Sequence, residues 1–471
     1  MYTKLIINNE EIETSQYSSS LNPMDGSVVG NVSIATIENV DNAFSSAKQA
    51  FKTWKNTSAH ERMYKLELVA GALLQKKNEI AALLCSEISK PMKDCIKEVE
   101  RSAEYILFTA HTYRTIEGRL VDGDRMPGIN HLQKTAIVTY EPLGVVLAIS
   151  PFNYPINLAV TKIAPALATG NTVVFKPASA GAISAYLMMK IFSEIMPAGV
   201  VNFITGKSSE IGDYMLSHKE VDMIAFTGST QIGRHIQELA KCPVYLELGG
   251  KDAALVLADA DVAKAANEIV KGGFSYSAQR CTAVKRVVVE DSVADELIGN
   301  ILTRVFQLKV GKAEEDADIT ALIDLKSMGY VMELINDAKN KGAELLCGGY
   351  SEGSVVYPTV LDHVTKEMRI YSEEPFGPVL PIIRVQNMEE ALSTVNDSKY
   401  GLQSDVFTQD INKAMYLANN IEAGTVQINA KSDRGPDNFP FPGIKDSGMG
   451  NAGLKDALLS MMKTKVIVIN L

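Results

Sequence analysis

Between Thr135 and Gly228 the sequence alternates short runs typical of β-strands with longer stretches typical of helices. The strand-like runs lie at 135–140, 144–149, 171–177, 200–206 and 222–228, and the helix-like stretches lie at 156–170 and 182–195. Strands that alternate with helices of this length indicate an α/β fold with a parallel, doubly wound sheet. A second α/β unit is predicted from about Gly249 to Ser447. The first hundred or so residues are expected to be mostly helical, because their apolar residues recur at helical spacing.

The size and charge of the chain limit the partners it can have. Its 471 residues, 46% of them hydrophobic, can bury a large core and suggest about three domain-sized units. The formal net charge of -10 disfavours nucleic acid, because proteins that bind a phosphate backbone present basic patches. Small molecules are therefore the expected partners.

The cysteines and apolar runs bear on the compartment. Five scattered cysteines, an odd number, do not resemble a disulfide framework or a metal-ligand cluster. The apolar stretch at 5–7 is too short for a signal peptide, and no run reaches the roughly 18 apolar residues of a membrane helix. The six histidines are not spaced like a zinc site. We expect a soluble, cytoplasmic protein with no metal and no membrane partner.

Cys281 is the candidate nucleophile. It directly follows Arg280 and lies among small polar residues, outside any apolar strand. A neighbouring positive charge stabilises a thiolate, so Arg280 is expected to lower the pKa of the Cys281 thiol. The alternative is that Cys281 is a small buried hydrophobic residue.

Glu247 is the candidate general base. It stands in an apolar run and is followed by Gly249 and Gly250, which let the backbone turn sharply or pass close to a ligand. Burial disfavours the charged form of a carboxyl group, so the pKa of Glu247 is expected to rise toward the range of a general base. A strained loop is the alternative.

Two turns are candidate ligand sites, although no G-x-G-x-x-G fingerprint follows a predicted strand. The segment 226–233 joins a predicted strand to a predicted helix, whose N-terminal N–H groups suit a pyrophosphate. Ordinary capping by Ser229 or Thr230 is the alternative. Asn153 follows another strand at the edge of the sheet where doubly wound folds bind ligands, so its amide is a candidate oxyanion donor. A simple turn is the alternative there.

Seven motifs in one order make the chain resemble the aldehyde dehydrogenase superfamily. They are PFNYP, FKPAS, FTGST, LELGGKD, the QRC segment, EEPFGP and PFPGIKDSGMG. AQRCTAVKRV and residues 434–441 look most like the NADP-dependent, non-phosphorylating glyceraldehyde-3-phosphate dehydrogenases of that superfamily. The resemblance implies a Rossmann-type cofactor domain at 1–117 and 138–248, an α/β catalytic domain at 249–447, and a small β oligomerisation arm at 118–137 and 448–471.

The resemblance also implies the chemistry. Cys281 would attack an aldehyde carbon, Asn153 and the Cys281 main-chain N–H would hold the oxyanion, and Glu247 would activate the water that hydrolyses the thioacyl enzyme. The implied cofactor is NADP, with NAD a weaker alternative. The implied cofactor residues are Ser150, Phe152, Lys176, Ser179, Asp213, Gly228, Ser229, Leu248, Glu374 and Phe376.

Ser179 bears on the choice of cofactor. Relatives that prefer NAD commonly have a glutamate there, which would repel a 2′-phosphate, whereas Ser179 removes that charge and Lys176 supplies attraction. A passive small residue that permits both cofactors is the alternative.

The residues implied to hold the substrate are Arg101, Asn153, Tyr154, Arg280, Cys281 and Arg434. Guanidinium groups match the oxygens of a phosphate, which favours D-glyceraldehyde 3-phosphate as substrate and 3-phosphoglycerate as product. Each arginine has an alternative: Arg101 as a solvated surface residue, Arg280 as a group that only tunes the thiol, and Arg434 as a group that only orders its loop. The rival functions are another aldehyde dehydrogenase, such as one for succinate semialdehyde, a non-catalytic binding protein, and acyl transfer to coenzyme A, which Glu247 disfavours.

The chain ends in a β-branched run at 465–471, which is expected to form an edge strand that needs cover. Pairing with another subunit is one solution, and pairing within the chain is the other. The resemblance implies a homotetramer.

Overall fold

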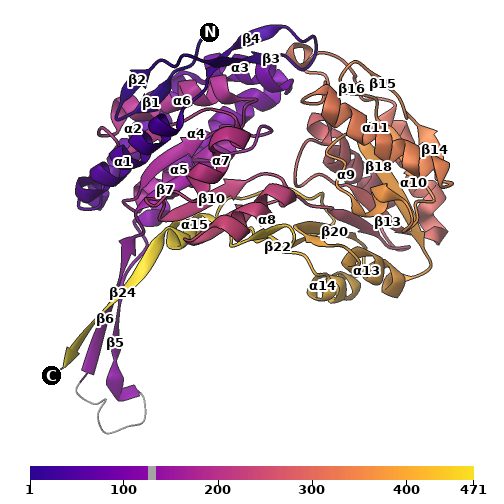
Figure 1. Ribbon diagram of the computed structural model, residues 1–471. Coiled ribbons are helices and arrows are strands. Elements are labelled where there is room, and N and C mark those ends of the chain that lie inside the picture. Colours follow the sequence, from indigo (N-terminus) through magenta and orange to yellow (C-terminus); the bar gives the residue numbers. More distant parts are fainter. Residues whose placement is uncertain (126–133, 471) are drawn as a thin grey trace.

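The computed structural model describes residues 1–125 and 134–470, which form two α/β units and a projecting arm (Figure 1). The first unit contains an eight-stranded sheet in the order β2-β1-β9-β8-β7-β10-β11-β23. Its strands are β1 (Leu5–Ile7), β2 (Glu10–Ile12), β7 (Val145–Ile149), β8 (Thr172–Lys176), β9 (Val201–Phe203), β10 (Met223–Thr227), β11 (Val244–Glu247) and β23 (Gly448–Met449).

Helices surround this sheet and bury it. They are α1 (Ile37–Trp54), α2 (Ala59–Gln75), α3 (Lys77–Ile88), α4 (Met92–Tyr113), α5 (Asn157–Ala168), α6 (Ala182–Ile195), α7 (Ser208–Leu216), α8 (Thr230–Leu239) and α15 (Leu454–Ser460). Strands β8 and β10 are buried along their whole length, which explains why their sequences are continuous apolar runs instead of alternating ones. The helical start is confirmed, and so is the alternation of strands and helices from residue 144 onward. The predicted strand at 135–140 is instead part of β6 (Lys134–Pro142), which pairs antiparallel in the arm and not in the parallel sheet.

The strand order creates a ligand-binding edge. Numbered along the chain, the parallel strands β7 to β11 lie in the order 3-2-1-4-5, so the order reverses between β7 and β10. Doubly wound sheets bind ligands at the carboxyl ends of the strands at such a reversal. Here those ends lead into Ser150–Asn153 and Gly228–Ser229. The two turns predicted as ligand sites therefore follow neighbouring strands.

The second unit is built on a seven-stranded sheet in the order β14-β17-β18-β13-β12-β20-β21. Its strands are β12 (Ala253–Val256), β13 (Arg286–Glu290), β14 (Glu344–Cys347), β17 (Thr359–Asp362), β18 (Val379–Val385), β20 (Gln403–Phe407) and β21 (Thr425–Ile428), all parallel to their neighbours except β14. Its helices are α9 (Val262–Phe274), α10 (Asp291–Val305), α11 (Leu325–Asn340), α12 (Arg369–Ser372), α13 (Met388–Asn396) and α14 (Ile411–Asn420). Short two-stranded pairs are β3 (Tyr17–Leu21) with β4 (Val28–Ser33), β15 (Ser351–Glu352) with β16 (Val355–Val356), and β19 (Tyr400–Gly401) with β22 (Ile444–Lys445).

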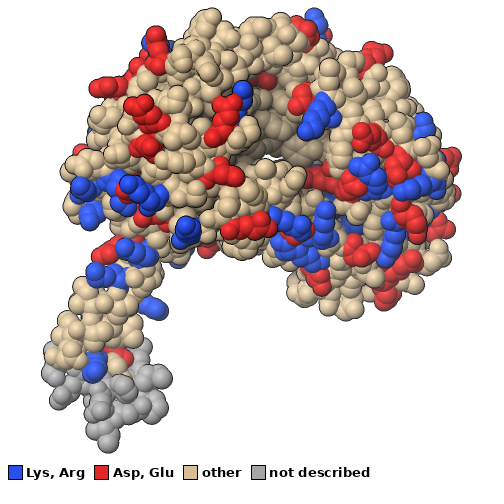
Figure 2. All heavy atoms as spheres, in the orientation of Figure 1, with Lys and Arg blue, Asp and Glu red and all other residues tan. Residues whose placement is uncertain are grey.

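The arm is a three-stranded sheet, β24-β6-β5, formed by β5 (Arg119–Asp122), β6 (Lys134–Pro142) and β24 (Met462–Asn470). Strand β24 pairs with β6 of its own chain over its whole length, which was one of the two predicted solutions. Its other edge pairs with no strand among the described residues, and Val466–Ile469 are 40–52% exposed. The visible face of the arm carries few charged side chains (Figure 2). Residues 126–133 of the predicted arm, and Leu471, lie outside the described residues.

The C-terminal segment divides between the arm and the first unit. Gly448 and Met449 pair with β11, and α15 packs against α4 and α5, so only β24 joins the arm. Within the described ranges, no helix is both long and apolar enough to cross a membrane.

Candidate active site

Cys281 lies between β12 and β13 of the second sheet, just after a tight turn in which Tyr276, Ser277 and Ala278 all have positive φ. Burial raises the pKa of the Cys281 thiol to about 11, and Lys285 opposes that shift. Arg280 points away from this role, because its Nη2 donates to the carbonyl of Gly272 at 2.7 Å. The expectation that Arg280 lowers the pKa of Cys281 is therefore wrong.

Glu247 ends β11 and is surrounded by cations. Its Oε1 lies 2.9 Å from Nη1 of Arg434, as an ion pair whose geometry is not that of a hydrogen bond, and its Oε2 accepts from Nζ of Lys162 at 3.0 Å. The Thr227 hydroxyl also donates to Oε2. Burial alone would raise the pKa of Glu247, but Arg434 and Lys162 outweigh it and lower the pKa to about 2. The predicted upward shift is wrong, and the carboxylate is ionised throughout the neutral range.

Asn153 is buried and tied to the segment that carries Cys281. Its Nδ2 donates to the main-chain carbonyl of Gln279 at 2.8 Å. Its own carbonyl accepts from Nζ of Lys90 at 3.2 Å. The oxyanion candidate is therefore hydrogen-bonded to the segment that carries the candidate nucleophile, and its role stays a prediction.

Lys90 and Glu98 form a buried pair that the sequence analysis missed. Their charged groups lie 2.5 Å apart, and both side chains are almost completely buried. Glu98 also accepts from the N–H groups of Ile156 and Asn157, at 3.0 and 3.1 Å, and so braces the start of α5. The available signal was a glutamate on the apolar face of α4, where an unpaired charge would be costly.

A cavity of about 260 Å³ brings together three of the predicted substrate residues. It is lined by Lys90, Asp94, Lys97, Glu98, Arg101, Tyr154, Asn157, Ser275, Tyr276, Arg280 and Asp433. Arg434 lines a smaller hollow of about 40 Å³, and Asp433 borders both spaces. Arg101, Tyr154 and Arg280 therefore line one cavity with Arg434 beside it, and their role in substrate binding stays a prediction.

The three arginines differ in how many of their donors already have a partner. Arg101 donates to the carbonyl of Arg434 at 2.7 Å and pairs with Asp437 at 2.9 Å, so it is more than a solvated surface residue. Nε of Arg280 and Nη2 of Arg434 are buried and have no acceptor among the described residues. Buried donors without partners are costly, and an anionic ligand would satisfy them.

The cofactor candidates gather around the strand reversal. The hydroxyl of Ser150, just after β7, is buried and has no partner in the described part of the chain. Lys176 ends β8, where burial lowers its pKa to about 8 and its Nζ donates to the Pro177 carbonyl at 3.4 Å. Ser179 follows on the exposed surface. An unsatisfied hydroxyl and a desolvated lysine at this edge fit a polar, anionic ligand such as a dinucleotide.

The helix that follows β10 completes this edge. Ser229 caps α8, because its hydroxyl accepts from the N–H of Ile232 at 3.4 Å, so the capping alternative is observed. A Cβ on Gly233 would lie 2.3 Å from Leu248, which requires glycine there and keeps α8 close to the end of β11. Gly228 and Ser229 therefore present a helix N-terminus beside Leu248.

The remaining cofactor candidates lie in two places. Glu374 accepts from the N–H of Gly250 at 3.1 Å and pairs with Lys285 at 3.1 Å, and the Phe376 ring lies 5.9 Å from the Phe152 ring. Asp213 lies on α7, exposed, and contacts Nε2 of His235 at 2.8 Å. Asp213 therefore contacts α8, the helix that follows β10.

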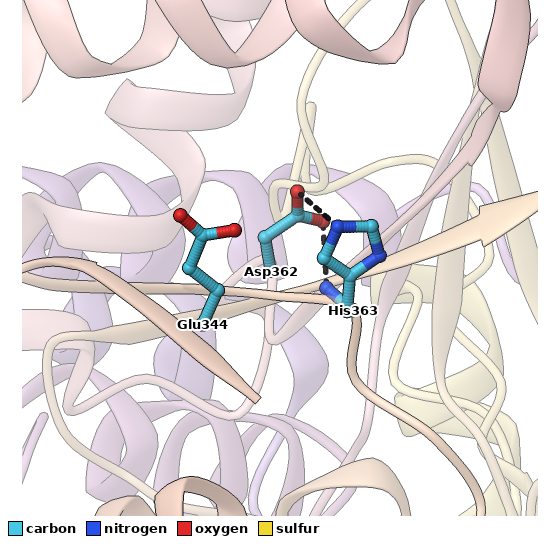
Figure 3. A group of neighbouring side chains, drawn as sticks. All are labelled: Glu344, Asp362 and His363. Carbon is cyan, nitrogen blue, oxygen red and sulfur yellow. Dashed lines mark hydrogen bonds and ion pairs between the residues drawn. The ribbon is translucent and has the colours of Figure 1, made fainter. Parts of the chain in front are cut away.

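One group of possible metal ligands lies in the second unit. Oxygen and nitrogen atoms of Glu344, Asp362 and His363 lie within 4.8 Å of one another (Figure 3). The Asp362 carboxylate already accepts from Nη2 of Arg384 at 2.7 Å and from its Nε at 3.1 Å. Asp362 is thus committed to an ion pair, and we assign no metal to this group.

Comparison with known sequences and structures places the chain in a family. The profile described as the aldehyde dehydrogenase family matches residues 11–467. The chain belongs to the aldehyde dehydrogenase family. The fold class and the family predicted from the motifs are thereby confirmed.

Proteins similar to this aldehyde dehydrogenase include several NADP-dependent glyceraldehyde-3-phosphate dehydrogenases. An NADP-dependent glyceraldehyde-3-phosphate dehydrogenase of Streptococcus equinus is 48% identical over 451 residues, covering 95% of this chain and 94% of its own. Its counterpart in Pisum sativum is 46% identical over 455 residues, covering 96% and 91%. The crystal structure of the NADP-dependent glyceraldehyde-3-phosphate dehydrogenase from Bacillus halodurans C-125 complexed with NADP has a TM-score of 0.98 at 48% identity, covering 100% of this chain and 99% of that one.

Proposed function

We propose that this aldehyde dehydrogenase oxidises D-glyceraldehyde 3-phosphate, with NADP and water, to 3-phosphoglycerate. The observation that carries the proposal is the cavity that joins Arg101, Tyr154 and Arg280, bordered by Arg434 and supplied with buried donors that lack acceptors. The names of its relatives agree with this substrate and cofactor.

In the proposed reaction each step depends on different residues of the chain. The Cys281 thiolate attacks the aldehyde carbon, and the Asn153 amide and the Cys281 N–H donate to the oxyanion that forms. NADP, when bound, supplies the hydride acceptor; Ser150, Lys176, Ser179, Gly228 and Ser229 would hold it. Glu247 then removes a proton from the water that cleaves the thioester, while Lys162 and Thr227 hold its Oε2.

Arg434 gives the sharpest test of the phosphate. Arg434→Ala removes a guanidinium that lies beside the cavity, so we expect kcat/KM for glyceraldehyde 3-phosphate to fall by about 10²-fold or more. For unphosphorylated glyceraldehyde the loss should be at least about tenfold smaller, because only the ion pair between Arg434 and Glu247 is lost there and no phosphate contact. NADPH formation at 340 nm measures both substrates.

Arg304→Ala is the matched control, since Arg304 lies on α10 and bonds the Asn300 carbonyl of its own helix. Equal losses for the two substrates in Arg434→Ala would contradict the phosphate proposal. Turnover by the unaltered enzyme with succinate semialdehyde alone would reassign these arginines to a carboxylate.

Ser179 tests the choice of cofactor. Ser179→Glu places a carboxylate on the exposed segment after β8, and we expect it to weaken NADP binding by about 10-fold or more through repulsion of the 2′-phosphate. NAD binding should hold or improve. Kd values for the two cofactors, measured by fluorescence titration, decide the matter, and an equal effect on both would mean that Ser179 is a passive residue.

Further proposals concern assembly and location. We infer that the chain associates with further copies of itself, because β24 leaves an open edge and an exposed apolar surface that a second copy would cover; the homotetramer is what the resemblance implies. The two sheets and the projecting strands support a division into a cofactor domain, a catalytic domain and an arm, in which β23 and α15 belong with the cofactor domain instead of the arm. A cytoplasmic location agrees with five cysteines that are all unpaired.

A further inference from the structure

Lys285 occupies an unusual position beneath the nucleophile. It precedes β13, four residues after Cys281, and its side chain is only 1% exposed. Its Nζ donates to the main-chain carbonyl of Cys281. The same Nζ lies 3.1 Å from Oε1 of Glu374, which in turn accepts from the N–H of Gly250. One buried ammonium group therefore ties the nucleophile segment to two other loops.

The charges around the thiol explain why this ammonium group matters. Three carboxyl groups from different parts of the chain act on the Cys281 thiol: Glu247 at the end of β11, Asp252 just before β12 and Glu374 after α12. Each raises the pKa of Cys281, in addition to burial. A thiolate in such surroundings needs a compensating cation.

The other cations near Cys281 already interact with other groups. Lys162 and Arg434 pair with Glu247, at 3.0 and 2.9 Å. Arg280 donates to the Gly272 carbonyl. Lys285 is also paired, but among the cations of residues 1–125 and 134–470 it alone hydrogen-bonds to Cys281 itself, and it lowers the thiol pKa.

We propose that Lys285 is the positioning residue for the nucleophile: held by Glu374, its ammonium group binds the Cys281 carbonyl and places a positive charge beside the thiol. Lys285 thus takes the role that the sequence suggested for Arg280. The proposal extends the proposed function, which supplies the reason for a reactive thiol, but it concerns the thiol itself and holds for any substrate.

Alkylation of Cys281 by iodoacetamide, followed by peptide mass spectrometry, measures thiolate directly without aldehyde or NADP. In the unaltered protein the rate should still be rising between about pH 8 and 10, because the thiol pKa is raised. Lys285→Met should slow alkylation at pH 8 by about tenfold or more, since each pKa unit changes the thiolate fraction tenfold. Lys285→Arg keeps the charge and should stay within about threefold of the unaltered rate.

Two further variants separate charge from packing. Lys285→Gln keeps a donor but no charge, and it should behave like Lys285→Met. Lys251→Met is the matched control, because Lys251 is another buried lysine whose Nζ donates to the Glu373 carbonyl and not to Cys281. Alkylation of Cys281 in the Lys251→Met variant should proceed at the unaltered rate. Circular dichroism checks the fold of each variant.

The outcomes distinguish the two proposals. Equal alkylation rates in the Arg and Gln variants would overturn the role of Lys285, and that comparison suffices even if the Met variant does not fold. Equal slowing in Lys251→Met would also overturn it, by showing a general disturbance. If the alkylation pattern is as expected but glyceraldehyde 3-phosphate is not oxidised, the role of Lys285 stands and the proposed substrate fails.

Discussion

Glu247→Gln should convert the enzyme into one that completes the first half of its reaction and then stalls. Removal of the general base should slow hydrolysis of the thioacyl enzyme by about 10²- to 10⁴-fold, because that is the usual contribution of such a group. Attack by Cys281 and hydride transfer need no base at position 247, so one NADPH per subunit should still form rapidly. Stopped-flow absorbance at 340 nm would show this burst, followed by slow turnover.

The Glu247→Gln experiment needs a check of folding, because Glu247 forms buried ion pairs. Glutamine leaves Lys162 and Arg434 without their buried anion, and breaking a buried pair can cost about 3–5 kcal/mol of stability. Thermal unfolding must therefore confirm that the variant is folded at the assay temperature. A folded variant that loses the burst as well as the turnover would contradict the role of Glu247 as the base for hydrolysis alone.

The pH dependence follows from the lowered pKa of Glu247. A carboxyl group whose folded pKa is about 2 stays ionised as the pH falls from 8 to 5, so its protonation should not cause a loss of activity in that interval. The stability that its ion pairs contribute is present above the unfolded pKa of about 4.3 and is lost as the pH falls toward 2.

Cys281→Ser should abolish both phases. A serine hydroxyl has no accessible anion near neutral pH and is a much weaker nucleophile than a thiolate, so we expect the burst to vanish and kcat to fall by more than about 10⁴-fold. NADP binding, measured by fluorescence titration, should be unchanged. Cys347→Ser is the matched control, because Cys347 is a partly buried cysteine in β14, and its replacement should change kcat by less than about twofold. Residual NADPH formation in Cys281→Ser at the unaltered rate would contradict the assignment of the nucleophile.

The order of strands and helices and the family were accessible from the sequence, which also predicts the reactive groups. Continuous apolar runs such as β8 and β10 are local patterns, and local patterns determine which segments become buried strands. The turns after β7 and β10 were likewise predicted as ligand sites, because a parallel sheet must bring the carboxyl ends of neighbouring strands together. Motifs around Cys281, Glu247 and Asn153 identified side chains whose roles depend on chemical type.

Only the tertiary structure decided which charges face one another. Adjacency in the chain made Arg280 the expected partner of Cys281, but the backbone turn at 276–278 directs its guanidinium to Gly272 and leaves Lys285 beneath the nucleophile. Burial predicted a raised pKa for Glu247, whereas Lys162 and Arg434, 85 and 187 positions away from it in the chain, lower it. A pKa depends on the charges within a few ångströms, and the fold assembles those from distant segments that no local pattern connects.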